Sequence, residues 1–456
     1  MDFNEYILKE KDNMILSLDR LVSINSVYAE PKENAPFGVG AKKALEEVKS
    51  IAIEMGLKAV IMYDRVAIID LYDNNIFPKV GILAHADVVP AGNGWEYEPF
   101  KATVDGENIF GRGVIDNKGP IISVLYAMKY IKENLKLKGN FRLIVGSDEE
   151  CGSSDLEYYK KYEKLPEYIF TPDANYPLIN VEKGRATGKF SKQIIGDKEK
   201  SIIKAYGGTV INAVPDRAYA EFKGFTIDEL AKISEKCQNN AKYEFGIDND
   251  IVLLTVYGKS AHASLLEEGE NAITALCEFL GLVDERFKCI SKACPHGDIY
   301  GKALGIDAFD DISGKLTYAF DLVKYENNVF EGEFDIRFPI CVTGNSLEDK
   351  LHNSFSFYGL NLSEFDSTEP HHTDANSAFV KCLLETYEKV TGEKGEALAV
   401  GGGTYAHEID GAVAFGPEIP GIDNKIHGAN EFIGIEHFMM NTRMMYEAIV
   451  ALDEKL

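Results

Sequence analysis

The segment AHADVVP, residues 84–90, places a histidine and an aspartate two positions apart at the end of an apolar run. The run KVGILAHADVV is typical of a β-strand, in which side chains alternate between two faces, so His85 and Asp87 are predicted to point the same way. Two explanations fit this pair. His85 is either a buried histidine held by Asp87, or a metal ligand whose second ring nitrogen is oriented by Asp87.

Acidic side chains lie near the ends of other predicted elements. The predicted strand FRLIV ends shortly before Glu149 and Glu150, and the predicted strand YIF ends just before Asp173. Asp116 lies in GRGVIDNKG, immediately before a predicted helix. The carboxyl ends of parallel strands meet at one edge of a sheet, where ligands collect. We therefore expect these carboxylates to gather beside His85.

The side chains expected at this edge have the chemistry of metal ligands. Zinc and manganese accept imidazole and carboxylate ligands, and a catalytic site keeps one coordination position for water. One further histidine would complete a two-metal site with a shared carboxylate. The candidates are His427 in the loop IHGANEF, His407 in GGGTYAHEIDG and His437 on the predicted final helix. A loop residue such as His427 can reach over a sheet edge, His437 on a helical face is more often packed, and His407 is a weaker alternative.

The elements that must position these residues alternate between strands and helices up to about residue 183. They include VAIIDLY, KVGILAHADVV, the amphipathic GPIISVLYAMKYIKENL, NFRLIVGSDEE and EYIFTPD. This alternation predicts an α/β domain that has a mostly parallel sheet with helices on both faces.

A β-rich segment begins near residue 186. Two strand, turn, helix and strand patterns occur in it, one from AYAEFKGFTIDELAKISEKC to IVLLTVYGK and the other in GEFDIRFPICVTGNSLEDKLHNSFSFYGLNL. They predict an inserted, internally duplicated α+β domain, because the helix and strand alternation returns afterwards. The predicted boundaries are 1–185 for the first part of the catalytic domain, 186–373 for the insertion and 374–456 for the second part.

Composition limits the class of protein. The chain has 456 residues, of which 45% are hydrophobic and 27% charged, as is typical of a globular protein with two or three domains. The formal charge of -25 argues against nucleic acids and anionic membranes as partners, because both attract basic surfaces. Seven scattered cysteines without a CxxC pair suit reduced thiols. Since no signal peptide or membrane-spanning run is apparent, the sequence predicts a cytoplasmic protein.

Five segments, in this order along the chain, resemble the metal-site motifs of one enzyme family: HADVVP, GRGVIDNKG, SDEECGS, TPDANYP and HGANE. The family is that of the di-zinc metallopeptidases, which include aminoacylase, succinyl-diaminopimelate desuccinylase and glutamate carboxypeptidase. The insertion, with NAVPDRAYA, GKSAHAS and FDIRFP, is most similar to the dipeptidase V branch of Xaa-His or β-Ala dipeptidases. The resemblance covers nearly the whole chain and implies a metal-dependent hydrolase.

The resemblance implies a ligand set for two divalent metal ions. His85, Asp116 and Asp173 hold one ion, whereas Asp116, Glu150 and His427 hold the other, so Asp116 is the bridging ligand. Zinc is the favoured metal, with manganese or cobalt as alternatives. The resemblance also predicts a cis peptide bond after Asp116.

Two further acids have implied roles. Glu149 takes a proton from the water shared by the metals and returns it to the departing amine, and Asp87 holds the second nitrogen of His85. Because position 173 is an aspartate, as on the dipeptidase side of the family, the predicted substrates are dipeptides with a free N-terminus. The alternative is an N-acyl-amino-acid deacylase of the aminoacylase or desuccinylase type. A non-catalytic binding protein of the same fold is a second alternative, which the presence of Glu149 argues against.

The insertion is predicted to act as a lid that completes the site. By resemblance, His262 in SAHAS donates to the oxyanion of the reaction, and Asn212 and Arg337 help to bind the substrate. Local explanations also fit: His262 packs in a loop, Asn212 serves a turn, or Arg337 pairs with Glu333 and Asp335 on an exposed strand face. The duplicated lid favours a monomer, and a homodimer is the alternative.

Overall fold

The structure is a computed structural model of the chain, and it describes residues 1–74, 76–196, 199–211, 213–261 and 266–456. It divides into two compact units. The first unit comprises Met1–Val181, His372–Leu398 and Gly403–Leu456, and the second unit comprises Glu182–His371 and Ala399–Gly402. Each unit contains an extensive hydrophobic core of its own.

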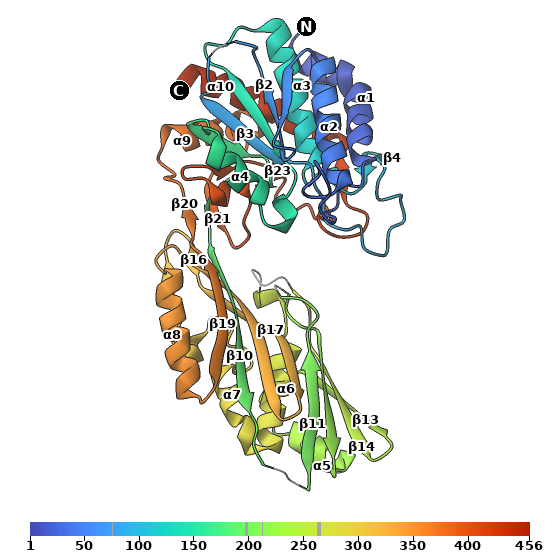
Figure 1. Cartoon of the computed structure of the whole chain (residues 1–456), viewed down its shortest axis with the longest axis vertical. Helices are drawn as coiled ribbons and strands as arrows, with labels where there is room; N and C mark the ends of the chain where they lie inside the picture. The colour runs from blue at the N-terminus through green and yellow to red at the C-terminus, as the bar shows by residue number, and fades with distance from the viewer. Residues whose placement is uncertain (75, 197–198, 212, 262–265) are drawn as a thin grey trace. The chain divides into compact units, whose positions relative to one another are not determined.

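A mixed sheet forms the centre of the first unit (Figure 1). Its strands include, in spatial order, β1 (Lys58–Met62), β2 (Val66–Asp70), β6 (Phe141–Gly146), β3 (Val80–His85), β7 (Tyr168–Thr171), β22 (Val413–Ala414) and β9 (Leu178–Glu182). The central strands β6, β3, β7 and β22 are parallel, whereas β1, β2 and β9 pair antiparallel. The predicted α/β class with a mostly parallel sheet is confirmed, and the parallel pairs are those at the sheet centre.

Helices cover both faces of this sheet because its strands are apolar on both faces. In β2, Ala67 and Ile69 belong to the core that includes α1, α2, α3, α9 and α10, whereas Val66 and Ile68 pack in a second cluster with α4. The helices are α1 (Phe3–Val22), α2 (Val39–Glu54), α3 (Lys118–Asn134), α4 (Ser154–Tyr162), α9 (Ala378–Thr391) and α10 (Ile435–Lys455). Among the described residues, no helix of either unit is long and apolar enough to cross a membrane.

Short strands complete the first unit. The strands β4 (Thr103–Asp105), β5 (Asn108–Phe110) and β24 (Phe432–Gly434) form a small sheet. The pair β8 (Ala174–Asn175) and β23 (Pro417–Glu418) is parallel, so it brings a late segment of the chain beside the residues that follow β7.

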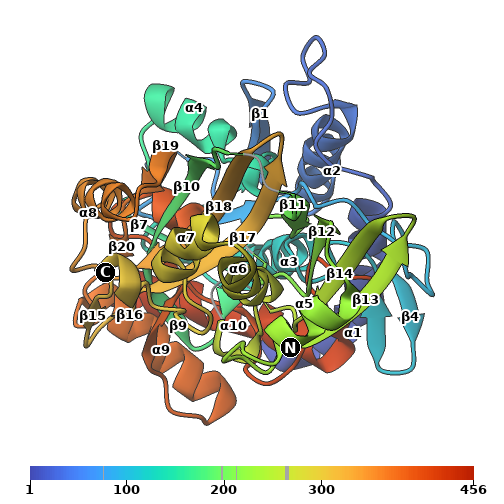
Figure 2. The same ribbon diagram turned by 90° about the horizontal axis from the view of Figure 1, so that it is seen from below.

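Eight antiparallel strands form the main sheet of the second unit. Their spatial order is β13 (Lys242–Asp248), β14 (Ile251–Tyr257), β12 (Arg217–Lys223), β11 (Ser201–Gly207), β17 (Thr317–Glu326), β18 (Val329–Phe338), β10 (Gly184–Gln193) and β19 (Asn361–Thr368). The helices are α5 (Ile227–Ser234), α6 (Ala272–Val283), α7 (Lys288–Ala293) and α8 (Gly344–Phe357), and α6 lies beside β17 (Figure 1 and Figure 2). The first predicted unit runs from β12 through α5 to β14, with the additional strand β13 before β14, and the second runs from β18 through α8 to the start of β19. Thr226 and Thr343 cap the two helices.

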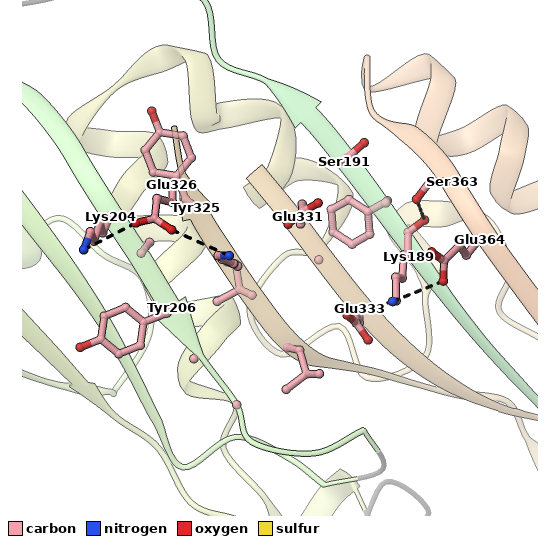
Figure 3. Close-up of a pocket in the computed structure, with 18 of the residues that line it drawn as sticks. Lys189, Ser191, Lys204, Tyr206, Tyr325, Glu326, Glu331, Glu333, Ser363 and Glu364 are labelled. Carbon is pink, nitrogen blue, oxygen red and sulfur yellow. Dashed lines mark hydrogen bonds and ion pairs between the residues drawn. The ribbon is translucent and has the colours of Figure 1, made fainter. Parts of the chain in front are cut away.

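One face of this second sheet carries helices, and the other face forms a groove of about 840 Å³ (Figure 3). In β10, Phe190 stacks on α8 in the core, whereas the preceding Lys189 lines the groove. Lys189 pairs with Glu364, and Lys204 pairs with Glu326 (Figure 3). Such paired charges are typical of the solvated face of an antiparallel sheet, so the groove is no candidate for the chemistry predicted from the sequence.

Candidate metal centre

The carboxyl ends of neighbouring parallel strands meet at one edge of the first sheet. His85 is the last residue of β3 and pairs in register with Gly146, the last residue of β6. The short helix η1 (Glu149–Cys151) follows β6, and Asp173 follows the end of β7. The common edge expected from the sequence is therefore present.

Asp116 lies between the two imidazoles. Its Oδ1 is 3.0 Å from Nε2 of His85, and its Oδ2 is 3.0 Å from Nε2 of His427. Nε2 of His85 is also 3.5 Å from Oδ1 of Asp173, and Nε2 of His427 is 3.2 Å from Oε2 of Glu150. The structure thus brings together the five predicted ligands, as two groups that share Asp116.

A loop with an unusual backbone carries His427 to this cluster. The φ angles of Lys425, His427 and Asn430 are 59°, 60° and 60°, in the left-handed region that non-glycine residues seldom adopt. The buried Asn424 fixes the base of the loop, because its side-chain amide donates to the carbonyl of Phe432 at 2.9 Å. The side chain of His427 is 55% exposed, whereas that of His85 is buried.

A cavity of about 160 Å³ lies against the cluster. The carboxylate of Glu149, which lines it, has an oxygen within 4.8 Å of ligand atoms of both His85 and Asp173. The ionisable residues lining the cavity are Asp116, Glu149, Glu150, Asp173, Glu418 and His427. Glu418 was not among the residues predicted from the sequence.

Carboxylates outnumber imidazoles around this cavity, which shifts the pKa values of both. Burial, together with nearby carboxylates, raises the pKa of Glu149 well above its usual value. The hydrogen bonds to Asp116 and Glu150 raise the pKa of His427 to about 10. Burial, followed by the charge of Asp116, raises the pKa of Glu418 to about 7. The site therefore holds excess negative charge, which a divalent cation would offset.

The donor set fits a divalent metal ion. Nδ1 of His85 lies 3.1 Å from the main-chain oxygen of Asp87, and because a carbonyl oxygen only accepts, this nitrogen carries a proton. In the neutral ring, the lone pair of Nε2 then points towards oxygens of Asp116 and Asp173. The lone pair and these oxygens repel each other unless a proton or a metal cation lies between them. Oε1 of Glu150 is buried without a hydrogen-bond partner in the described part of the chain. Imidazole nitrogen and carboxylate oxygen are ligands that zinc and manganese use.

Asp87 connects the ends of two strands behind the cluster. Its Oδ2 accepts a hydrogen bond from the main-chain N–H of Glu150 at 3.1 Å. Its Oδ1 is 3.5 Å from Nδ1 of His85, farther than its own main-chain oxygen. The contact with Glu150 was not foreseen, and the hold of the Asp87 carboxylate on His85 stays a prediction.

Asn117 and Glu431 fix the cluster, although neither was assigned a role from the sequence. Asn117 donates from Nδ2 to Oδ1 of Asp173 at 2.7 Å, and the peptide bond from Asp116 to Asn117 is cis, as expected. Glu431 is fully buried, and its Oε1 accepts from the N–H of Gly113 at 2.9 Å. Both lie within the quoted segments GRGVIDNKG and HGANE, which is the signal that would have found them.

A buried pair, Tyr405 and Asp155, holds the turn that leads to Glu149 and Glu150. The hydroxyl of Tyr405 donates to Oδ2 of Asp155 at 2.7 Å, and the same oxygen accepts from the N–H of Asp148 at 3.1 Å. No sequence pattern links these two residues, because Asp155 begins a helix and Tyr405 follows a distant glycine-rich loop. The pair explains why β6 ends in a glycine.

The Gly146→Ala substitution is expected to lower the free energy of unfolding by about 2–4 kcal/mol, because overpacking and the loss of a charged hydrogen bond each cost stability. A methyl group at this position would lie 2.0 Å from the hydroxyl of Tyr405 and 2.5 Å from Oδ2 of Asp155. Chemical denaturation measures the effect. The control is Gly246→Ala in β13, where nothing lies within 4 Å of the added group. Equal effects at the two glycines would contradict the role of the Tyr405 and Asp155 pair.

The other histidines considered from the sequence do not line the cavity. His437 is buried, and its Nε2 lies 2.7 Å from the main-chain oxygen of Pro417, so it packs in the first unit. His407 lies in the short helix η5 (Tyr405–Glu408). The predicted residues Asn212 and His262 lie outside the described residues.

Arg337 is buried within the second unit. Its Nε donates to Oδ1 of Asp335 at 2.7 Å, and its Nη1 donates to the main-chain oxygen of Gly401 at 2.7 Å. The alternative of pairing with Glu333 and Asp335 on an exposed face is right for Asp335 as the partner, but wrong for the exposure, because both residues are buried, and for Glu333, which pairs with Lys189. The predicted contact of Arg337 with substrate stays a prediction.

Known proteins are similar to this chain over most of its length. Residues 81–451 match the model of peptidase family M20/M25/M40. YtjP of Bacillus subtilis (strain 168) is 32% identical over 466 residues, which cover 99% of this chain and 100% of that protein. Beta-Ala-Xaa dipeptidase of Lactobacillus delbrueckii subsp. lactis is 31% identical over 473 residues, 100% of both chains.

A solved structure shows the same fold. Human carnosine dipeptidase 1 has a TM-score of 0.59 to this chain at 15% identity, and the match covers 99% of this chain and 98% of that one. The family model and the two full-length relatives confirm the resemblance carried by the five segments. The chain therefore belongs to peptidase family M20/M25/M40.

Proposed function

We propose that this protein is a metal-dependent dipeptidase that hydrolyses dipeptides with a free N-terminus. The observation that carries the proposal is the pair of imidazoles, His85 and His427, that face opposite oxygens of Asp116 beside a cavity lined by Glu149. The similarity to Beta-Ala-Xaa dipeptidase over the full length of both chains supports a dipeptide as substrate rather than an N-acyl amino acid.

Two divalent ions are proposed as cofactors. His85, Asp116 and Asp173 would hold one ion, and Asp116, Glu150 and His427 would hold the other. Zinc suits this mixture of nitrogen and oxygen ligands, and manganese and cobalt are the alternatives. When bound, such ions polarise a carbonyl oxygen and lower the pKa of water.

Glu149 is proposed as the general base and acid. Its position beside His85 and Asp173 supports this role, as does the burial that raises its pKa well above the usual value. The Glu149 carboxylate takes a proton from water as the water oxygen bonds to the scissile carbonyl carbon. It then gives this proton to the departing amine nitrogen as the carbon–nitrogen bond breaks, which leaves a free amino acid on each side.

The second unit is proposed to act as a lid. In this proposal residues 1–185 and 374–456 form the catalytic domain, and residues 186–373 form the lid domain. Arg337 and Asn212 would bind the substrate's carboxylate or carbonyl, and His262 would donate to the oxyanion. The bonds of the Arg337 guanidinium to Asp335 and to the main-chain oxygen of Gly401 fix its position within the second unit.

We propose a monomeric, cytoplasmic enzyme. The eight strands of the second sheet pair within one chain, which supports a monomer, with a homodimer as the alternative. All seven cysteines are free thiols in the structure, which suits a reducing compartment.

The test of the proposed function is a substrate panel on metal-stripped protein re-supplied with zinc, manganese or cobalt. Alanyl and β-alanyl dipeptides are expected to have kcat/KM values at least about tenfold above those of N-acetyl amino acids, since differential binding of one group commonly gives such ratios. Faster hydrolysis of the N-acetyl amino acids would instead support a deacylase. Absence of hydrolysis with every metal would support a binding protein of this fold.

A further inference from the structure

Glu418 is the acid lining the cavity that the proposed mechanism does not use. It ends β23, which pairs in parallel with β8 directly after Asp173. The main-chain oxygen of Glu418 accepts from the N–H of Tyr176 at 2.8 Å, and that of Gly416 accepts from the N–H of Ala174 at 2.7 Å. These bonds fix the backbone beside Asp173, and with it the direction in which the Glu418 side chain leaves the strand.

Glu418 is half-buried and lines the cavity, yet no hydrogen bond or ion pair joins its carboxylate to another of the described residues. Three of the other four acids of the cavity pair with an imidazole of the cluster, and the fourth, Glu149, has an oxygen within 4.8 Å of a ring nitrogen of His85. Asp116, Glu150 and Asp173 lie 3.0–3.5 Å from His85 or His427. Glu149 has the proposed role in proton transfer, so Glu418 is left as a carboxylate that has neither a role in the proposed mechanism nor a cationic partner among the described residues.

The proposed substrate supplies such a partner. A dipeptide with a free N-terminus carries an ammonium group two bonds from its scissile carbonyl carbon, or three bonds in a β-amino acid. When that carbonyl reaches the cluster, the ammonium must lie in the same small cavity. Removing an ammonium group from water is costly unless an acceptor of opposite charge replaces the water.

On the basis of the proposed function, we infer that Glu418 binds the protonated amino terminus of the dipeptide and selects against substrates in which it is blocked. Hydrogen bonds between oppositely charged groups are stronger than those between neutral groups. One carboxylate at this place therefore increases the affinity for the dipeptide and orients it. An N-acyl group would instead place a carbonyl oxygen against the Glu418 carboxylate. This contact is unfavourable, because both groups are hydrogen-bond acceptors.

The experiment compares Glu418→Gln with wild type on two substrates that share one amide bond. One is a dipeptide, and the other is its analogue with a hydroxyl group in place of the terminal amine. Wild type is expected to favour the dipeptide in kcat/KM by about 10- to 100-fold, the range of a hydrogen bond to a charged group. Glu418→Gln is expected to lose most of this preference through a higher KM for the dipeptide, with a nearly unchanged kcat and unchanged metal content.

Two further variants complete the experiment. Glu418→Asp keeps the negative charge and is expected to retain most of the preference for the amine. Glu436→Gln alters an exposed acid on α10 and is expected to behave as wild type.

The outcomes separate this inference from the proposed function. If wild type hydrolyses neither substrate with any metal, the dipeptidase proposal fails. If wild type hydrolyses the dipeptide and Glu418→Gln keeps the full preference for the amine, the inference about Glu418 is wrong while the dipeptidase proposal stands. Loss of bound metal in Glu418→Gln, with equal loss of activity on both substrates, would also overturn the inference, because it would make Glu418 a ligand.

Discussion

The Glu149→Gln variant is expected to lower kcat for dipeptides by about 100- to 10,000-fold, the range that a positioned proton-transfer group contributes. Glutamine has nearly the same shape as glutamate but cannot accept the proton of the attacking water. Burial, together with neighbouring carboxylates, raises the pKa of Glu149 well above that of an exposed glutamate. The group therefore binds a proton more strongly than an exposed glutamate does.

The loss should appear in kcat, because the five proposed ligands are untouched. Metal content and the thermal midpoint are expected to match wild type, and Glu436→Gln provides a matched glutamate-to-glutamine control on the surface. Turnover that is unchanged in Glu149→Gln, with metal in place, would exclude Glu149 as the base. Loss of metal in this variant would instead make it a ligand.

The fold of the first unit was predictable because its elements are long and regular. Apolar runs such as KVGILAHADVV need burial on both faces, and β2 and β3 supply side chains to the clusters on each side of the sheet. The antiparallel β1, β2 and β9 were not predicted, because an apolar run carries no signal of strand direction. Their direction depends on the length of each connection, and the turn from β1 to β2 is too short for a crossover.

The ligands were predictable to the extent that they follow strand ends. His85 ends β3, and Glu150 and Asp173 lie shortly after β6 and β7, so the parallel arrangement brings them to one edge. The choice of His427 over His407 and His437 came from its place in a loop and from the resemblance of HGANE to a known motif. The left-handed backbone that directs His427 is a tertiary property, which no local pattern specifies.

Glu418, Asp155 and Tyr405 escaped prediction for a different reason. The strands β8 and β23 are two residues each, too short to give a periodic pattern, so nothing in the sequence places Glu418 beside Asp173. The bond between Tyr405 and Asp155 likewise joins segments far apart in the chain. Side chains that support a site from a distance become visible only when the strands are in place.

Removal of divalent metal ions is expected to abolish hydrolysis and to lower the midpoint of thermal unfolding by about 5–10 °C relative to protein with metal about 100-fold above its Kd. The charges of the cluster give the reason. In one group of possible ligand atoms, oxygens of Asp116 and Glu150 lie within 4.8 Å of a ring nitrogen of His85. In a second group, oxygens of Glu149 and Asp173 lie within the same distance of a ring nitrogen of His85. Without a cation, carboxylates held so close repel each other or take up protons.

The measurement pairs elemental analysis with thermal unfolding and a dipeptide assay, before and after chelation and re-supply of each metal. Glu149→Gln is expected to keep the metal-dependent shift in midpoint although it lacks activity, because Glu149 is not a proposed ligand. Asp116→Asn is expected to lose the metal-dependent shift in midpoint as well as the hydrolysis of dipeptides. Its side chain would offer a single neutral oxygen, whereas Asp116 turns one oxygen to each imidazole. Metal-free protein that hydrolyses dipeptides at the wild-type rate would contradict the metal centre itself, and a midpoint shift that persists in Asp116→Asn would mean that the ions bind elsewhere.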